Sequence, residues 1–133
     1  MFTNTAIKKI PDCLQNVTKV GQKAFYTCKE LTEVTLTEID TVGVGAFYQC
    51  AALKQVTLES TRYIDADAFR SCAALERLSL PKVEFIGNFA FNSCTKLESI
   101  DLPQALSIGN YTFAKCENIK EVSVPKVEWL GME

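Results

Sequence analysis

The sequence predicts a short α/β solenoid, a right-handed stack of coils with parallel β-strands on one side and single helical turns on another. One observation behind this prediction is a phenylalanine that recurs every 22 residues, and another is a cysteine with the same spacing. Equivalent residues of stacked coils lie next to each other, so such columns are expected to form rows along one axis. The columns are Phe25, Phe47, Phe69, Phe91 and Phe113, and Cys28, Cys50, Cys72, Cys94 and Cys116.

The strands are predicted from an alternation of polar and apolar residues within each repeat. In the run 33–36, Val34 and Leu36 face inward and the residues beside them face solvent. This pattern is typical of a strand with one buried face. A second, shorter extended piece is expected at 82–86 and its equivalents, because Ile86 belongs to another apolar column.

The helical turns are predicted from the segment 24–31 and its equivalents. Phe25, Cys28 and Leu31 are three residues apart, which suits a short helix or a 3₁₀ turn with one buried side. Glycine, aspartate or asparagine shortly before this segment, such as Gly21, suits a tight turn and a helix start. Each repeat is therefore expected to carry one helical turn between two extended pieces.

The length of 133 residues suits one domain. Residues 1–14 are expected to form an N-terminal cap segment, and residues 15–133 the solenoid, with five full 22-residue units and a partial sixth. The end coil of a solenoid leaves its apolar side bare unless something covers it. No lid is visible for the C-terminal coil, so self-association, where it occurs, is expected to use that end.

The composition argues against several functional classes. The 14 basic and 16 acidic residues give a net charge of −2, which provides no electrostatic reason to expect nucleic acid or membrane-surface binding. No apolar run reaches the roughly 18–20 residues of a membrane span. Histidine, the commonest general base and metal ligand, does not occur. We therefore expect no enzyme, no cofactor and no metal site. The laddered cysteines are expected to be buried thiols, and Cys13 is the one expected to react.

The consensus of the repeats is P-x-V-x-x-I-G-x-x-A-F-x-x-C-x-x-L-x-x-V-x-L, and it resembles the BspA-type leucine-rich repeat. This resemblance covers residues 15–131 and implies a leucine-rich-repeat solenoid. It also implies adhesion or protein binding, usually at the cell surface or in a secreted protein, although no signal peptide is visible. The residues that carry the resemblance are Ile86, Gly87, Ala90, Phe91, Cys94, Leu97, Ile100, Leu102 and Pro103, with their counterparts in the other units.

Candidate binding residues are those that vary between repeats and face outward. On the predicted strand face they are Glu33, Thr35, Gln55, Thr57, Arg77, Ser79, Ser99, Asp101, Glu121 and Ser123. A solenoid commonly binds partners on such a face, and the alternative is a merely solvated sheet. A second candidate is an aromatic patch or end formed by Phe85, Phe89, Tyr111, Trp129 and Leu130. Exposed aromatic side chains suit binding hot spots, and the alternative is that they only cover the core edge.

These observations favour a non-enzymatic protein- or glycan-binding module of adhesion type that presents a variable outer face. The expected partner is another protein or a glycan. The alternative is a structural component of a larger cell-surface or phage-particle complex, which would associate through its uncapped C-terminal coil. An enzyme is the third class, and no constellation of residues supports it.

Overall fold

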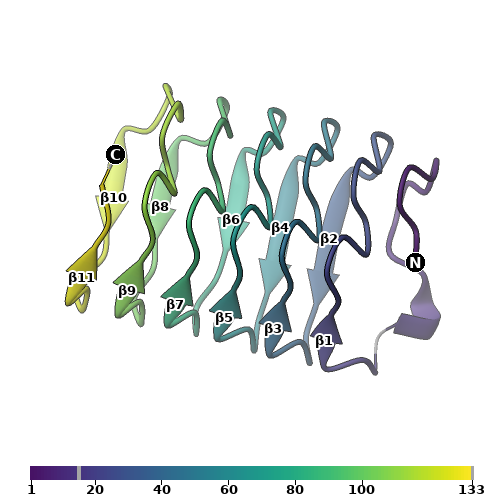
Figure 1. Ribbon diagram of the computed structural model, residues 1–133, viewed down its shortest axis with the longest axis horizontal. Coiled ribbons are helices and arrows are strands. Elements are labelled where there is room, and N and C mark those ends of the chain that lie inside the picture. The colour runs from purple at the N-terminus through teal and green to yellow at the C-terminus, as the bar shows by residue number, and fades with distance from the viewer. Residues whose placement is uncertain (15, 133) are drawn as a thin grey trace.

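The structure is a computed structural model that describes residues 1–14 and 16–132. The chain forms a row of coils stacked along one axis (Figure 1). The N-terminal segment lies at one end of the row, and β11 lies at the other. Each coil contains a two-residue strand, a turn segment and a longer strand. The predicted solenoid of parallel strands is confirmed.

Two series of strands run along the stack. The two-residue strands form one six-stranded sheet in the order β1 (Lys19–Val20), β3 (Thr41–Val42), β5 (Tyr63–Ile64), β7 (Phe85–Ile86), β9 (Ser107–Ile108) and β11 (Trp129–Leu130). The longer strands form a three-stranded sheet of β2 (Glu33–Leu36), β4 (Gln55–Leu58) and β6 (Arg77–Ser79), and a two-stranded sheet of β8 (Ser99–Asp101) and β10 (Glu121–Ser123).

The pairing register follows the repeat length. Val34 pairs with Val56, and Phe85 pairs with Ser107, so each partner lies 22 positions later in the chain. All of these pairs are parallel. A slip of one residue would turn every buried side chain of a strand to the outside, so the apolar columns fix this register.

The expected helical turns are wrong, and with them the α/β class. Among the described residues, the single helical element is the 3₁₀ turn η1 (Asp12–Leu14). The segment 24–31 is instead a run of tight turns, in which Tyr26 N–H donates to Lys23 O at 3.2 Å and Cys28 N–H donates to Phe25 O at 3.2 Å. The fold is therefore a β-solenoid.

Backbone conformation explains why no helix forms on the turn side. Two positions of each turn have positive φ, as at Asp67 (57°) and Ser71 (61°), and this left-handed region ends a right-handed helix. The N–H groups of these two residues point to the next coil, where Asn88 O accepts at 3.0 Å and Asn92 O accepts at 2.8 Å. The turns are thus tied to each other along the axis as strands are. The other positions are Lys23, Thr27, Gly45, Gln49, Phe89, Ser93, Tyr111 and Lys115.

The phenylalanine and cysteine columns form the core of the turn side. Neighbouring rings from Phe25 to Phe113 stack with centroids 5.1 to 5.6 Å apart and planes within 5°. Each thiol donates to the phenylalanine carbonyl of the preceding coil, as Cys72 does to Phe47 O at 3.1 Å. Repeated identical contacts of this kind hold the coils in register.

The N-terminal residues from Phe2 to Lys8 follow the same bonding pattern as a coil. Phe2 stacks on Phe25 with centroids 5.3 Å apart, and its N–H donates to Ala24 O at 2.8 Å. Its carbonyl accepts from the Cys28 thiol at 2.9 Å. We call residues 1–14 the head segment; it lies against the first complete coil at the N-terminal end of the stack (Figure 1).

Candidate functional site

The outward residues of the longer strands lie in two adjacent columns. Gln55 and Thr57 are half-buried, and the remaining members are exposed. A shallow hollow of about 290 Å³ lies on this face. Polar side chains from three successive coils line it, namely Thr32, Glu33, Lys54, Gln55, Glu76 and Arg77. By register, one column contains Glu33, Gln55, Arg77, Ser99 and Glu121, and the other contains Thr35, Thr57, Ser79, Asp101 and Ser123.

Ion pairs cross from coil to coil beside these columns. Lys9 Nζ lies 3.3 Å from Glu33 Oε1, and Lys120 Nζ lies 3.5 Å from Glu98 Oε2. These side chains are about half exposed or more, so each pair contributes at most about 1 kcal/mol. The face therefore carries charges of both signs on a rigid frame, which suits polar recognition more than it stabilises the fold.

The aromatic candidates form separate stacked pairs. Phe89 stacks on Tyr111 with centroids 5.2 Å apart, and Phe85 stacks on Tyr63 with centroids 5.4 Å apart. Register places Phe85 and Trp129 in one column with Ser107 between them. The structure thus brings Phe89 and Tyr111 together, whereas Phe85 takes a partner that the sequence analysis left out of the set.

Each stacked pair also carries a cation. Arg62 lies over the Tyr63 ring at 5.3 Å and makes two hydrogen bonds to Glu84, at 3.0 and 3.1 Å. The hydrogen bonds from Arg62 lower the pKa of the Glu84 carboxyl. Arg70 similarly lies over the Phe89 ring at 5.0 Å and is bonded to Asp67 at 3.0 Å. Rings covered in this way are ordered, and less of their faces is left to a ligand.

The cysteines divide as the sequence indicated. The five laddered thiols are buried, Cys13 is exposed, and all are free. Burial raises the pKa of Cys50 to about 12 and that of Cys116 to about 11. With raised pKa values, Cys50 and Cys116 stay protonated at neutral pH, and a protonated thiol is a poor nucleophile and a poor metal ligand. In the part of the chain that the structure describes, no three potential metal-ligating side chains cluster together.

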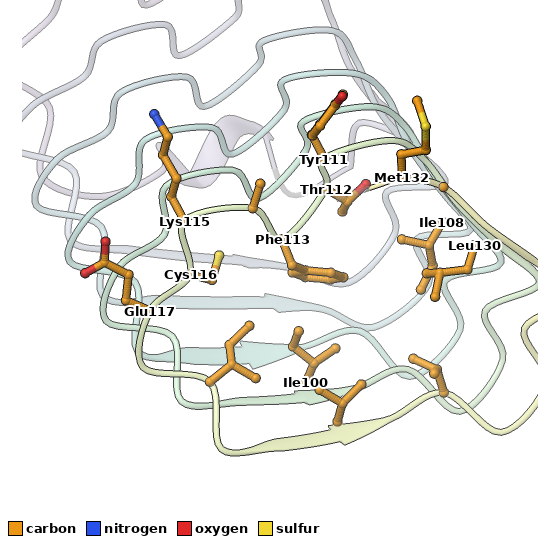
Figure 2. Close-up of a pocket in the computed structure, with 15 residues that line it drawn as sticks. Ile100, Ile108, Tyr111, Thr112, Phe113, Lys115, Cys116, Glu117, Leu130 and Met132 are labelled. Atoms are coloured by element: carbon orange, nitrogen blue, oxygen red, sulfur yellow. The ribbon is translucent and has the colours of Figure 1, made fainter.

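A large hollow lies at the C-terminal end of the stack. It has a volume of about 540 Å³ and is mainly apolar. Figure 2 shows Phe113, Cys116, Ile100, Ile108 and Leu130 around it, with Lys115 and Glu117 at the rim. We call this surface the C-terminal end face.

The exposure of this end face follows from position in the stack. Ile100 is 3% exposed, whereas Val122, its equivalent one coil later, is 61% exposed. Ile108 is 2% exposed, whereas Leu130 is 64% exposed. Sequence analysis singled out Trp129 and Leu130 here but missed Val122, which sits in a column that is elsewhere inward.

The backbone of the end face also has free hydrogen-bonding capacity. In earlier coils the N–H groups at the equivalent positions donate to the next coil, as Phe91 does to Thr112 O at 3.0 Å. No carbonyl of residues 1–14 or 16–132 accepts from Phe113 N–H or Lys115 N–H. An edge of this kind is a template for pairing with another chain segment.

The repeats of this chain match a known family of repeat proteins. A model of the BspA type leucine rich repeat region matches residues 40–128 in six copies. The chain belongs to the BspA-type leucine-rich repeat family. The family and its fold are typically non-catalytic, and the repeat scaffold is consistent with a protein-interaction module.

Three solved leucine-rich repeat structures resemble this chain. A leucine-rich repeat protein from Bacteroides ovatus is 31% identical, with a TM-score of 0.86, over 98% of this chain and 34% of that chain. A Treponema pallidum leucine-rich repeat protein is 31% identical, with a TM-score of 0.81, over 88% of this chain and 57% of that chain. A leucine-rich cell surface protein from Faecalibacterium prausnitzii is 30% identical, with a TM-score of 0.76, over 82% of this chain and 31% of that chain.

The present chain therefore spans from about a third to rather more than half of the length of these proteins. No curated protein matches it. Within the described residues, no helix has the length and apolar character needed to cross a membrane.

Proposed function

We propose that this BspA-type repeat chain is a non-enzymatic binding module of adhesion type, which recognises a protein or a glycan through its outer strand face. The observation that supports it is the pair of outward columns on the longer strands, where residue type changes from coil to coil. The buried columns beneath them change little, so the frame stays constant while the outer chemistry varies. The similar Faecalibacterium protein is described as a cell surface protein, and this supports a surface role.

The centre of the proposed surface is the hollow over β2, β4 and β6. Gln55 and Arg77 lie next to each other in register and offer an amide and a guanidinium to a ligand. The ligand meets preformed positions, because hydrogen bonds on both sides of each coil fix the strands. Such preorganisation reduces the entropy that binding costs.

This function is tested with a displayed random-peptide library and a glycan array, both probed with the purified chain. The test variant is Gln55→Ala with Arg77→Ala, and the matched control is Gln22→Ala with Lys29→Ala, which removes exposed groups of similar chemistry elsewhere. We expect bound ligands to weaken at least tenfold in the test variant and not in the control, about 1.4 kcal/mol or more. Ligands that tolerate the test variant, or no ligand from either source, would count against the proposal.

A second candidate function is a structural part of a larger assembly, joined through the C-terminal end face. The specific observation in its favour is the apolar hollow lined by Phe113 and Leu130, together with the free N–H groups beside it. Surfaces that combine an apolar patch with an open backbone edge suit protein association. We propose that the head segment, at the other end of the stack, is an N-terminal cap that covers the first complete coil of residues 15–133.

A further inference from the structure

We propose that the C-terminal end face takes the head segment of a second copy of this chain, so that copies stack head to tail. This inference rests on the assembly role proposed above and names its partner. The head segment is the expected occupant because, within one chain, it already packs against the first complete coil. Phe2, Asn4 and their neighbours repeat there the bonding pattern that joins one coil to the next.

Backbone groups at the two ends are complementary. In the coils, the acceptors for this series of N–H groups are the residues immediately before and after the laddered phenylalanine, as Ala46 O and Tyr48 O are beside Phe47. In the head segment the equivalent residues are Met1 and Thr3, on either side of Phe2. Among the described residues, no N–H group donates to the Met1 or Thr3 carbonyl. A docked second copy supplies these two carbonyls to the free N–H groups of the end face.

Apolar side chains match in the same register. Phe2 of the second copy falls over Phe113, as it does over Phe25 within its own chain at 5.3 Å. The β1 strand then follows β11 in the short-strand sheet, which places Val20 beside Leu130. An apolar hollow of about 170 Å³ at the N-terminal end, lined by Phe2, Ile10, Val20 and Phe25 among others, faces the hollow of the C-terminal end face in this arrangement.

Charges favour the same docking. Lys9 lies one coil before Glu33 and pairs with it at 3.3 Å. Glu121 belongs to the Glu33 column in the last coil, so a docked Lys9 lies next to it as well. Lys19 of the second copy follows Trp129 in register, where a cation over an indole ring is favourable. One unfavourable contact, Lys8 with Lys120, is weakened because Lys120 already pairs with Glu98 at 3.5 Å.

The geometry has a distinctive consequence, because the two surfaces that meet are different. A head-to-tail contact of this kind is heterologous, and along a straight stack it does not close into a ring. Association therefore continues beyond the dimer as concentration rises. A symmetric pair of C-terminal end faces would instead stop at two copies.

The test uses two variants that each block one end. Val122→Asp with Leu130→Asp places charges on the C-terminal end face at exposed positions, which limits the effect on folding. Lys9→Glu with Lys19→Glu reverses charge at the N-terminal end, also at exposed positions. The matched control is Ala51→Asp with Ala73→Asp, which adds the same charge to exposed sites on the side of the stack. Circular dichroism and thermal unfolding check that each variant is folded.

We expect sedimentation equilibrium to show an average mass of the wild type that rises with concentration past the dimer, and the same for the side control. Each end variant alone should associate at least tenfold more weakly. An equimolar mixture of the two end variants should form a one-to-one dimer and nothing larger, because one intact head meets one intact end face.

Two results would overturn the inference and are distinguishable. A wild type that remains monomeric at every concentration rules out self-stacking, and leaves the strand-face function to its own ligand test. In the second result, the wild type forms a dimer and nothing larger. If the Val122 and Leu130 changes abolish this dimer and the Lys9 and Lys19 changes do not affect it, the end face pairs with itself. That outcome keeps an assembly role and excludes the head segment as its occupant.

Discussion

At the scale of single residues, the thiol column couples the fold to pH. Cys50, Cys72, Cys94 and Cys116 are buried and each donates to a carbonyl, and burial disfavours their ionised form in the folded chain. Burial raises the pKa of Cys50, Cys72, Cys94 and Cys116, to about 12 for Cys50 and about 11 for Cys116. In the unfolded chain the same thiols titrate near their ordinary value of about 8.5.

We expect the free energy of unfolding to be unaffected by these thiols below about pH 8.5 and to fall as pH rises above it. The sign follows because the unfolded state then loses protons that the folded state keeps. Each thiol contributes roughly 1.4 kcal/mol of loss per pH unit until its folded pKa is reached. Urea unfolding from pH 7 to pH 10 measures the slope. Cys72→Ala should make the slope shallower, and an unchanged slope would contradict the assignment.

In the glycine column that contains Gly21 and Gly87, Gly87 lies where neighbouring coils approach each other closely, and substitution by alanine tests whether this approach requires glycine. A Cβ at Gly87 would lie 2.5 Å from Ala66 N and 2.8 Å from the Asp65 carbonyl carbon, in the backbone of the preceding coil. Gly87→Ala should therefore lower stability by about 1–3 kcal/mol, as overpacking does. Gly21→Ala is the control, because nothing lies within 4 Å of the added carbon. Thermal unfolding measures both, and equal effects would mean that coil-to-coil approach is not the cause.

The sequence identified which residues point inward, but not how well each one is covered. The columns that contain Val34 and Val42 could be predicted from spacing alone, because equivalent coils impose the same environment. Val122 and Leu130 share those columns and are still exposed, because coverage comes from the following coil and not from the residue itself. The C-terminal end face was therefore predictable only in part, through the incomplete last unit.

At the scale of elements, the turn segments decide between a helical and a left-handed conformation. Gln49 is exposed and has a φ of 54°. At such a position glycine is more stable than alanine by about 1 kcal/mol, whereas in a helical turn alanine is more stable by about 1 kcal/mol. We expect Gln49→Gly to unfold at a higher temperature than Gln49→Ala. The reverse order of unfolding temperatures would indicate a helical conformation at this position, as the sequence predicted.

The helical prediction failed for an identifiable reason. Spacings of three between Phe25, Cys28 and Leu31 fit any chain path that returns a side chain to one face every three residues. A series of tight turns does so as well as a helix. Lys23 and Thr27, which adopt positive φ, carry no glycine or asparagine signal. Their conformation is imposed by hydrogen bonds to Val44 O and Tyr48 O in the next coil, which local sequence does not reveal.

At the scale of the whole molecule, each coil contacts mainly its two neighbours, so coils should be removable in whole units. Deletion of residues 59–80 keeps every column in register and joins the second unit to the fourth. We expect this shortened chain to fold with the same circular dichroism spectrum and a smaller urea m-value, because less surface is buried. Deletion of 59–69 alone shifts the register and should leave the chain unfolded. An unfolded product from the whole-unit deletion would show that stability is not a sum over neighbouring coils.

The hydrogen bonds that join the coils run along the length of the stack on both the strand and the turn sides. A force applied to the two termini therefore loads the end coil first and the others only after it has come away. Peeled in this way, each coil releases 22 residues, about 75 Å of extended chain. Such a molecule would lengthen under tension in equal steps, one coil at a time, when its two ends are pulled apart.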